Sequence, residues 1–98
     1  MDELNIKGKK YPFLFANRAN REMSKCKDLA KKDDVYFLWL GFKYGSILDG
    51  KKFPYSEDEL VDIFDLNMKL FAEAGVIFAE QMGEFKAAKA PILKVIIK

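Results

Sequence analysis

The sequence predicts an α+β fold in which an N-terminal β-hairpin packs on a bundle of three to four α-helices. Apolar residues first alternate at period two around a glycine, and then recur at spacings of three and four along most of the chain. Half of the 98 residues are hydrophobic and 33% are charged, which is the balance of a soluble globular protein. A chain of this length supports one domain, which we place at residues 1–84, with a C-terminal extension at 85–98.

The hairpin is predicted at residues 3–15. The segment 4–7 alternates apolar and polar residues, Gly8 interrupts it, and Tyr11, Phe13 and Phe15 then share one face of a second strand. An isolated hairpin is marginally stable in water, so its apolar face must pack on the helices.

The first two helices are predicted at about 16–32 and 34–45. A narrow apolar stripe defines the first and includes Cys26, which we interpret as an inert thiol. Asp33 and Asp34 offer an N-cap for the second, which is apolar on every side. A buried strand is the alternative for this segment, but Lys43 and a glycine cap at Gly45 favour a helix.

Two further helices are predicted at 56–65 and 67–83. Ser56 and Glu59 form a capping-box pattern at the start of the third helix, and Asp65 or Asn67 can begin the fourth. We expect Gly83 to weaken or end that helix. The core is predicted to contain Phe37, Trp39, Leu40, Phe64, Phe71 and Phe78.

The extension at 85–98 differs from the rest of the chain. Every residue after Pro91 is isoleucine, leucine, valine or lysine, a composition that favours a short C-terminal strand. The alternatives are that this segment pairs with the hairpin or stays mobile until a partner arrives.

Enzymatic chemistry is not indicated. The chain has no histidine and one cysteine, and it lacks the glycine-rich, nucleophile-elbow and paired-cysteine motifs of common catalytic and metal sites. We therefore predict no catalytic residue, cofactor or metal. No apolar run reaches the roughly 20 residues that span a bilayer, and the first residues are acidic, so a cytoplasmic protein is expected.

Charge is distributed in three blocks. Residues 1–32 carry a net +5, residues 33–84 a net −7 and residues 85–98 a net +4. The blocks either neutralise each other within one chain or attract each other between copies. The candidate self-association residues are Arg18, Arg21, Lys25, Glu57, Asp58 and Asp62. A basic face near the hairpin lysines also permits phosphate-backbone binding, although the acidic block makes a nucleic-acid partner unlikely.

Partner binding is assigned to apolar residues that exceed the needs of the core. Methionines adapt to varied surfaces, and a segment rich in β-branched residues can add a strand to a partner. The candidates are Met68, Val76, Ile77, Met82, Ile92, Leu93, Val95, Ile96 and Ile97.

In order, these features resemble the small tail assembly chaperones of long-tailed, siphovirus-like phages and prophages. That family opens with a strand, a turn and an aromatic strand, continues with an apolar helix that ends in a G-x-K-x-G pattern, and then has an acidic helix. The resemblance spans residues 4–84, although Lys7 replaces the asparagine usual before the turn glycine. The matching positions are Gly8, Lys9, Tyr11, Phe13, Phe15, Ala19, Arg21, Glu22, Leu40, Gly41, Lys43, Gly45, Ser46, Glu59, Leu60, Ile63 and Asp65.

The resemblance implies a non-enzymatic function. Proteins of that family coat the long helical tape measure protein, keep it soluble and recruit tail tube subunits before they leave. The implied partners are therefore the tape measure protein and the tail tube protein, in the cytoplasm of a bacterial host. The charge blocks, and not the resemblance, are the reason that we also expect a weak homo-oligomer. The alternatives are a virion structural or connector protein and a small phosphate-binding accessory protein.

Overall fold

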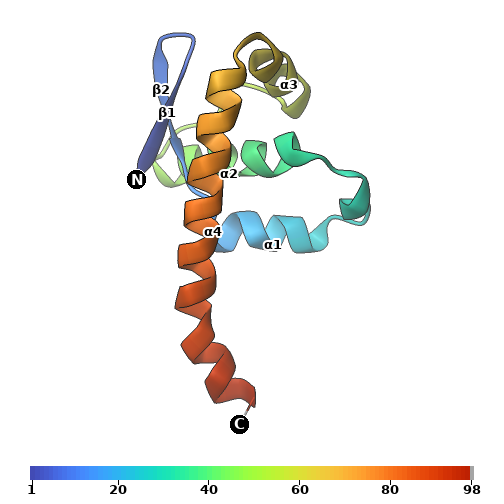
Figure 1. Cartoon of the computed structure of the whole chain (residues 1–98), viewed down its shortest axis with the longest axis vertical. Coiled ribbons are helices and arrows are strands. Elements are labelled where there is room, and N and C mark those ends of the chain that lie inside the picture. The colour runs from blue at the N-terminus through green and yellow to red at the C-terminus, as the bar shows by residue number, and fades with distance from the viewer. Residues whose placement is uncertain (98) are drawn as a thin grey trace.

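The computed structural model describes residues 1–97, with the backbone alone for residues 91–97. Its architecture confirms the α+β prediction, with an antiparallel two-stranded hairpin packed on helices (Figure 1). In chain order the elements are β1 (Asp2–Ile6), β2 (Lys9–Phe13), α1 (Asn17–Lys25), the 3-10 turn η1 (Leu29–Lys31), α2 (Asp34–Leu48), α3 (Glu57–Leu66) and α4 (Met68–Ile97).

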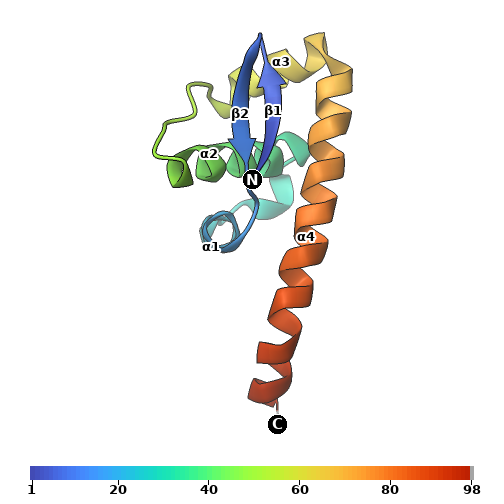
Figure 2. The ribbon, with the colours of Figure 1, turned by 90° about the vertical axis from the view of Figure 1, so that its left-hand side faces the viewer.

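The hairpin is closed by a two-residue turn at Lys7 and Gly8. Both residues have positive φ, at 53° and 84°, which is the geometry that matches the twist of the flanking strands. The backbone N–H of Gly8 also donates to Oδ1 of Asn5 at 2.9 Å. One face of the hairpin is buried, with Leu4 on β1 opposite Tyr11 on β2. Figure 2 shows the hairpin lying across α2, with β1 beside α4.

Helix α2 is the centre of the fold and packs against β2, α1, α3 and α4. It is helical rather than a buried strand, as the preferred interpretation required. The prediction that Gly45 caps it was wrong, because Gly45 is buried inside the helix, which continues to Leu48. Gly45 instead allows the hairpin to pack closely on α2, since a Cβ at residue 45 would meet the carbonyl oxygen of Pro12. The N–H of Leu14 also donates to the carbonyl oxygen of Gly41 at 3.0 Å.

Helix α1 is shorter than the predicted span of 16–32. It ends at Lys25, Cys26 is extended with ψ at 117°, and η1 follows as a separate turn. The hydroxyl of Ser24 donates back to the carbonyl oxygen of Asn20 at 2.9 Å, a bond that weakens a helix end. The thiol of Cys26 donates to a carboxylate oxygen of Asp28 at 3.2 Å, which further stabilises this non-helical corner.

The predicted helix starts are confirmed. Oδ1 of Asp33 accepts from the N–H of Tyr36 at 3.3 Å at the start of α2. Ser56 and Glu59 exchange both bonds of the capping box, each at 3.1 Å. Asn67 is the single residue between α3 and α4, and its Oδ1 accepts from the N–H of Leu70 at 3.2 Å.

Helix α4 corrects the prediction for the C-terminal part of the chain. It passes Gly83 without ending and continues through Pro91 to Ile97, so the expected strand at 92–97 is a helix. The segment 85–90 is rich in alanine and lysine, which are strong helix formers and carry the helix forward. Isoleucine and valine cost a helix only a few tenths of a kcal/mol relative to alanine. Among the described residues, the sheet contains β1 and β2 and no third strand.

The core lies where the hairpin, α2, α3 and α4 meet. Leu40 and Phe64 are buried as predicted, but Phe37, Trp39, Phe71 and Phe78 are partly exposed at its rim. The interior is filled by side chains from the hairpin and its exit, from α2 and from α3. The largest fully buried side chains are Phe13, Phe15, Phe42, Phe64, Ile6, Leu40, Leu60 and Ser46.

A buried glutamine joins α4 to the hairpin. Nε2 of Gln81 donates to the carbonyl oxygen of Phe13 at 2.9 Å and to a carboxylate oxygen of Asp2 at 3.0 Å. Oε1 of Gln81 accepts from the N–H of Phe15 at 2.8 Å. Two of these bonds satisfy backbone groups at the point where β2 ends, and the third reaches β1 through the Asp2 side chain, so together they fix the position of α4 relative to the hairpin.

Candidate functional site

An open apolar groove lies between the first two turns of α2 and the first half of α4. Its volume is about 450 Å³, within the range of sites that hold a ligand or a partner side chain. Its lining is almost wholly apolar and aromatic, with one carboxylate. The lining residues are Asp34, Phe37, Leu38, Met68, Phe71, Ala72, Gly75 and Phe78.

The helical repeat of α4 places its share of the groove on one face. Met68, Phe71, Gly75 and Phe78 follow spacings of three and four, so they form one stripe. Met68 is 59% exposed at the start of this stripe.

The aromatic side chains that line the groove pack against buried aromatic side chains of the core. Phe71 contacts Phe64 with ring centroids 5.1 Å apart, and Phe78 contacts Phe15 at 4.8 Å. Phe37 faces Phe78 at 6.4 Å. Because these rings pack on the core with one edge and line the groove with the other, the walls are preorganised.

Gly75 makes the floor of the groove open. A Cβ placed on this residue would meet no atom within 4 Å. The glycine is therefore not required by packing inside the chain, although it costs a helix about 1 kcal/mol relative to alanine. Its effect is to leave space between Phe71 and Phe78.

Asp34 is the only charged residue among those that line the groove. It lies in the first turn of α2, where a carboxylate interacts favourably with the helix dipole. A partner with an apolar face and a Lys or Arg beside that face would match this lining, because the cation could pair with Asp34.

The predicted partner-binding residues do not form one site. Met68 lies in the groove, whereas Val76 and Ile77 line a second, shallower hollow beside Leu4 on β1. Met82 is partly buried against the core. The side chains of Ile92, Leu93, Val95, Ile96 and Ile97 lie outside the described part of the structure.

Of the eight residues that line the groove, only Met68 was among the predicted partner-binding residues. Phe37, Phe71 and Phe78 were assigned to the core instead. The signal that could have identified the groove was Gly75 in the middle of an aromatic stripe. A helix face that packs in a core carries large side chains, whereas a glycine leaves a gap.

The predicted self-association residues lie on two separate faces. Arg18, Arg21 and Lys25 are exposed on α1, around a hollow that also includes Glu22 and Tyr44. Glu22 is paired with Lys43 at 3.0 Å, and burial, followed by the neighbouring Glu22 carboxylate, raises the pKa of Tyr44. On α3, Asp58 and Asp62 are exposed and Glu57 is partly buried.

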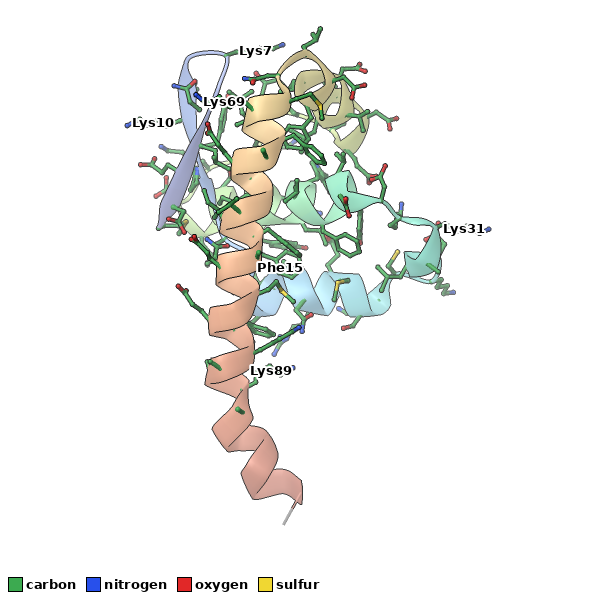
Figure 3. All side chains as sticks on the ribbon, viewed as in Figure 1. Lys7, Lys10, Phe15, Lys31, Lys69 and Lys89 are labelled. Carbon is green, nitrogen blue, oxygen red and sulfur yellow. The ribbon has the colours of Figure 1, made fainter. Side chains whose placement is uncertain are left out.

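The hairpin lysines are not continuous with the basic face of α1. Lys7 and Lys10 lie at the turn end of the hairpin, whereas Phe15, which leads into α1, lies at the opposite end (Figure 3). The lysines at the hairpin turn therefore lie away from the start of α1.

No protein-family model, curated protein or solved structure matches this chain. Within the part of the chain that the structure describes, no helix is both long enough and apolar enough to cross a membrane.

Proposed function

We propose that this protein is a non-enzymatic binding protein of the phage tail assembly chaperone type, which holds an amphipathic helix of its partner in the groove between α2 and α4. The observation that carries the proposal is the open apolar groove, whose walls are preorganised by the core. The resemblance of residues 4–84 to tail assembly chaperones supplies the partner, the long helical tape measure protein.

The groove suits recognition of a helix. An amphipathic helix binds such a surface by inserting apolar side chains spaced by three and four residues, and the space above Gly75 accommodates one of them. Met68 at the exposed end can adapt to partner side chains of different shape.

The groove also suits a partner that must later be released. It is shallow enough to leave Met68 more than half exposed, so each bound helix buries a limited apolar area. A protein that coats a long chain through many such contacts binds it by avidity, and loses it when the individual contacts are displaced.

The test uses two matched variants in α4. Gly75→Leu fills the groove, whereas Gly83→Leu places the same side chain at an exposed position where a Cβ also meets nothing within 4 Å. Both replace a helical glycine, so both are expected to be at least as stable as the wild type. Each is co-expressed with the long, helix-rich protein that the proposal expects to be encoded immediately downstream of this gene.

We expect the wild type and Gly83→Leu to keep the tape measure protein soluble and to co-purify with it, and Gly75→Leu to lose both properties. Equal behaviour of the two variants would show that the groove is not the binding site. Recovery of the chain in purified phage particles would support the virion structural alternative instead, because a chaperone leaves before the particle is complete.

A further inference from the structure

The exposed charges of α1 and α3 form two stripes of matching geometry. On α1, Arg18, Arg21 and Lys25 are all exposed and lie on one helical face at spacings of three and four. On α3, the residues Asp58, Asp62 and Asp65 are all exposed and lie on one face at spacings of four and three. Each stripe is about 10 Å long, at 1.5 Å per residue.

One end of each stripe carries a charge that is unfavourable for its own helix. Arg18 lies in the first turn of α1, where a cation opposes the helix dipole, and that turn contains no acid. Asp65 lies in the last turn of α3, where an anion opposes the dipole, and that turn contains no base. Local helix electrostatics therefore does not explain either charge.

The stripes have no ion partners within the described residues. The two salt bridges found there join Glu22 to Lys43 and Asp49 to Lys51. Glu59 on α3 is engaged in the capping box. The six side chains of the two stripes are thus available to another molecule.

The two stripes lie on opposite sides of α2. Helix α2 packs against both α1 and α3, and Figures 1 and 2 both place α3 and α1 on different sides of it. One copy therefore does not pair its own stripes.

We propose that the α1 stripe of one copy docks antiparallel on the α3 stripe of a second copy, and that repetition of this contact assembles the protein head to tail. Antiparallel docking matches the two spacings residue by residue. It pairs Arg18 with Asp65, Arg21 with Asp62, and Lys25 with Asp58. The two charges that oppose their own helix dipoles neutralise each other in this arrangement. The contact joins two different surfaces and is therefore heterologous, so its repetition adds further copies to a chain or a ring.

This contact refines the predicted self-association residues, because Asp65 replaces the partly buried Glu57. It does not use the groove between α2 and α4, so it is independent of the proposed function. Exposed ion pairs are individually weak, and we expect a dissociation constant in roughly the millimolar range.

The test compares neutralised stripes with matched controls by sedimentation and small-angle scattering at about 1 mM protein and low salt. One variant carries R18Q, R21Q and K25Q, and a second carries D58N, D62N and D65N. The controls remove equal charge elsewhere, with K10Q, K52Q and K69Q in one and E73Q, E80Q and E84Q in the other. Circular dichroism confirms that each variant is folded.

We expect the wild type and both controls to form species larger than dimers that dissociate in 1 M salt, where the Debye length is about 3 Å. Each stripe variant alone is expected to be monomeric. An equimolar mixture of the two stripe variants should stop at a dimer, because each retains the stripe that the other lacks. A monomeric wild type, equal loss of association in the controls, or a mixture without dimers would overturn the proposal.

Discussion

The ring of Phe13 occupies the space that a side chain at residue 41 would need. A Cβ on Gly41 would overlap the ring carbons of Phe13, and one on Gly45 would meet backbone atoms of Pro12 and Leu14. The two glycines are four residues apart on α2 and therefore share the face on which the hairpin lies. The close approach of hairpin and helix depends on this glycine face.

Gly41→Ala and Gly45→Ala should therefore destabilise the fold. We expect a decrease of about 1–3 kcal/mol in the free energy of unfolding, because overpacking outweighs the gain in helix propensity. Gly45→Ala should cost more, since its neighbours are backbone atoms that cannot rotate away.

Gly75→Ala and Gly83→Ala are the matched controls for these variants. Neither Cβ meets an atom within 4 Å, so each should raise the stability by about 0.5–1 kcal/mol. Urea unfolding of all four variants measures the difference. A uniform sign across the four would contradict this account of the hairpin contact.

These glycines also mark how far the sequence could be interpreted. The period-two and period-three-to-four patterns predicted that a hairpin and helices follow in this order, although α1 ends earlier and α4 ends later than expected. Gly45 was read as a helix cap, since Lys43 and Gly45 are typical of a helix end. A glycine that ends a helix and a glycine that lets a strand pack closely on the helix look alike in the sequence. Only the tertiary contact with Pro12 shows that Gly45 is the second kind.

Gln81 is the second residue whose role depends on distant contacts. It accepts from Phe15 N–H and donates to the carbonyl oxygen of Phe13, so Gln81→Met leaves both groups unpaired in the core. We expect a cost of about 1–3 kcal/mol, together with faster hydrogen exchange at the Phe15 amide. Glu80→Met is exposed on the same helix and should change stability by less than about 0.5 kcal/mol. Equal stability of the two variants would be inconsistent with the bridging role.

The candidate groove was only partly predictable. Met68 was identified because the chain has more apolar side chains than its core needs. Phe37 and Phe78 were expected in the interior because aromatic side chains are usually buried. They lie at the rim because Phe13 of β2 and Phe15, two residues later, already occupy the interior. A periodic pattern shows which residues share a face, and the volume already taken by other elements decides how deep that face is buried.

Trp39 provides a spectroscopic check on this arrangement. The indole is partly exposed, its Nε1 donates to the carbonyl oxygen of Tyr55 at 3.0 Å, and Nζ of Lys43 lies 4.9 Å from the ring centroid. We expect native emission between the wavelengths of a buried and a fully hydrated indole. Trp39→Phe should cost about 0.5–1.5 kcal/mol through the lost hydrogen bond. Emission typical of a fully hydrated indole in the folded protein would refute this placement.

Stability should fall at high pH because of Tyr36. Burial, followed by a hydrogen bond with Cys26, raises the pKa of Tyr36 to about 12 in the folded chain, against an ordinary value near 10. Below pH 10 the phenol is protonated in both the folded and the unfolded chain, so its full contribution to stability is present. Between pH 10 and about 12 only the unfolded chain loses the proton, and the free energy of unfolding declines with rising pH.

Tyr36→Phe isolates this effect. Two pKa units correspond to roughly 2–3 kcal/mol, so the wild type should lose about that much more stability than the variant between pH 10 and pH 12. The measurement is urea unfolding at intervals of half a pH unit, with absorbance near 295 nm to follow phenol ionisation. Because Tyr36 is only 6% exposed, its ionisation should accompany unfolding and not precede it. Parallel stability curves for the two proteins above pH 10 would contradict the shifted pKa.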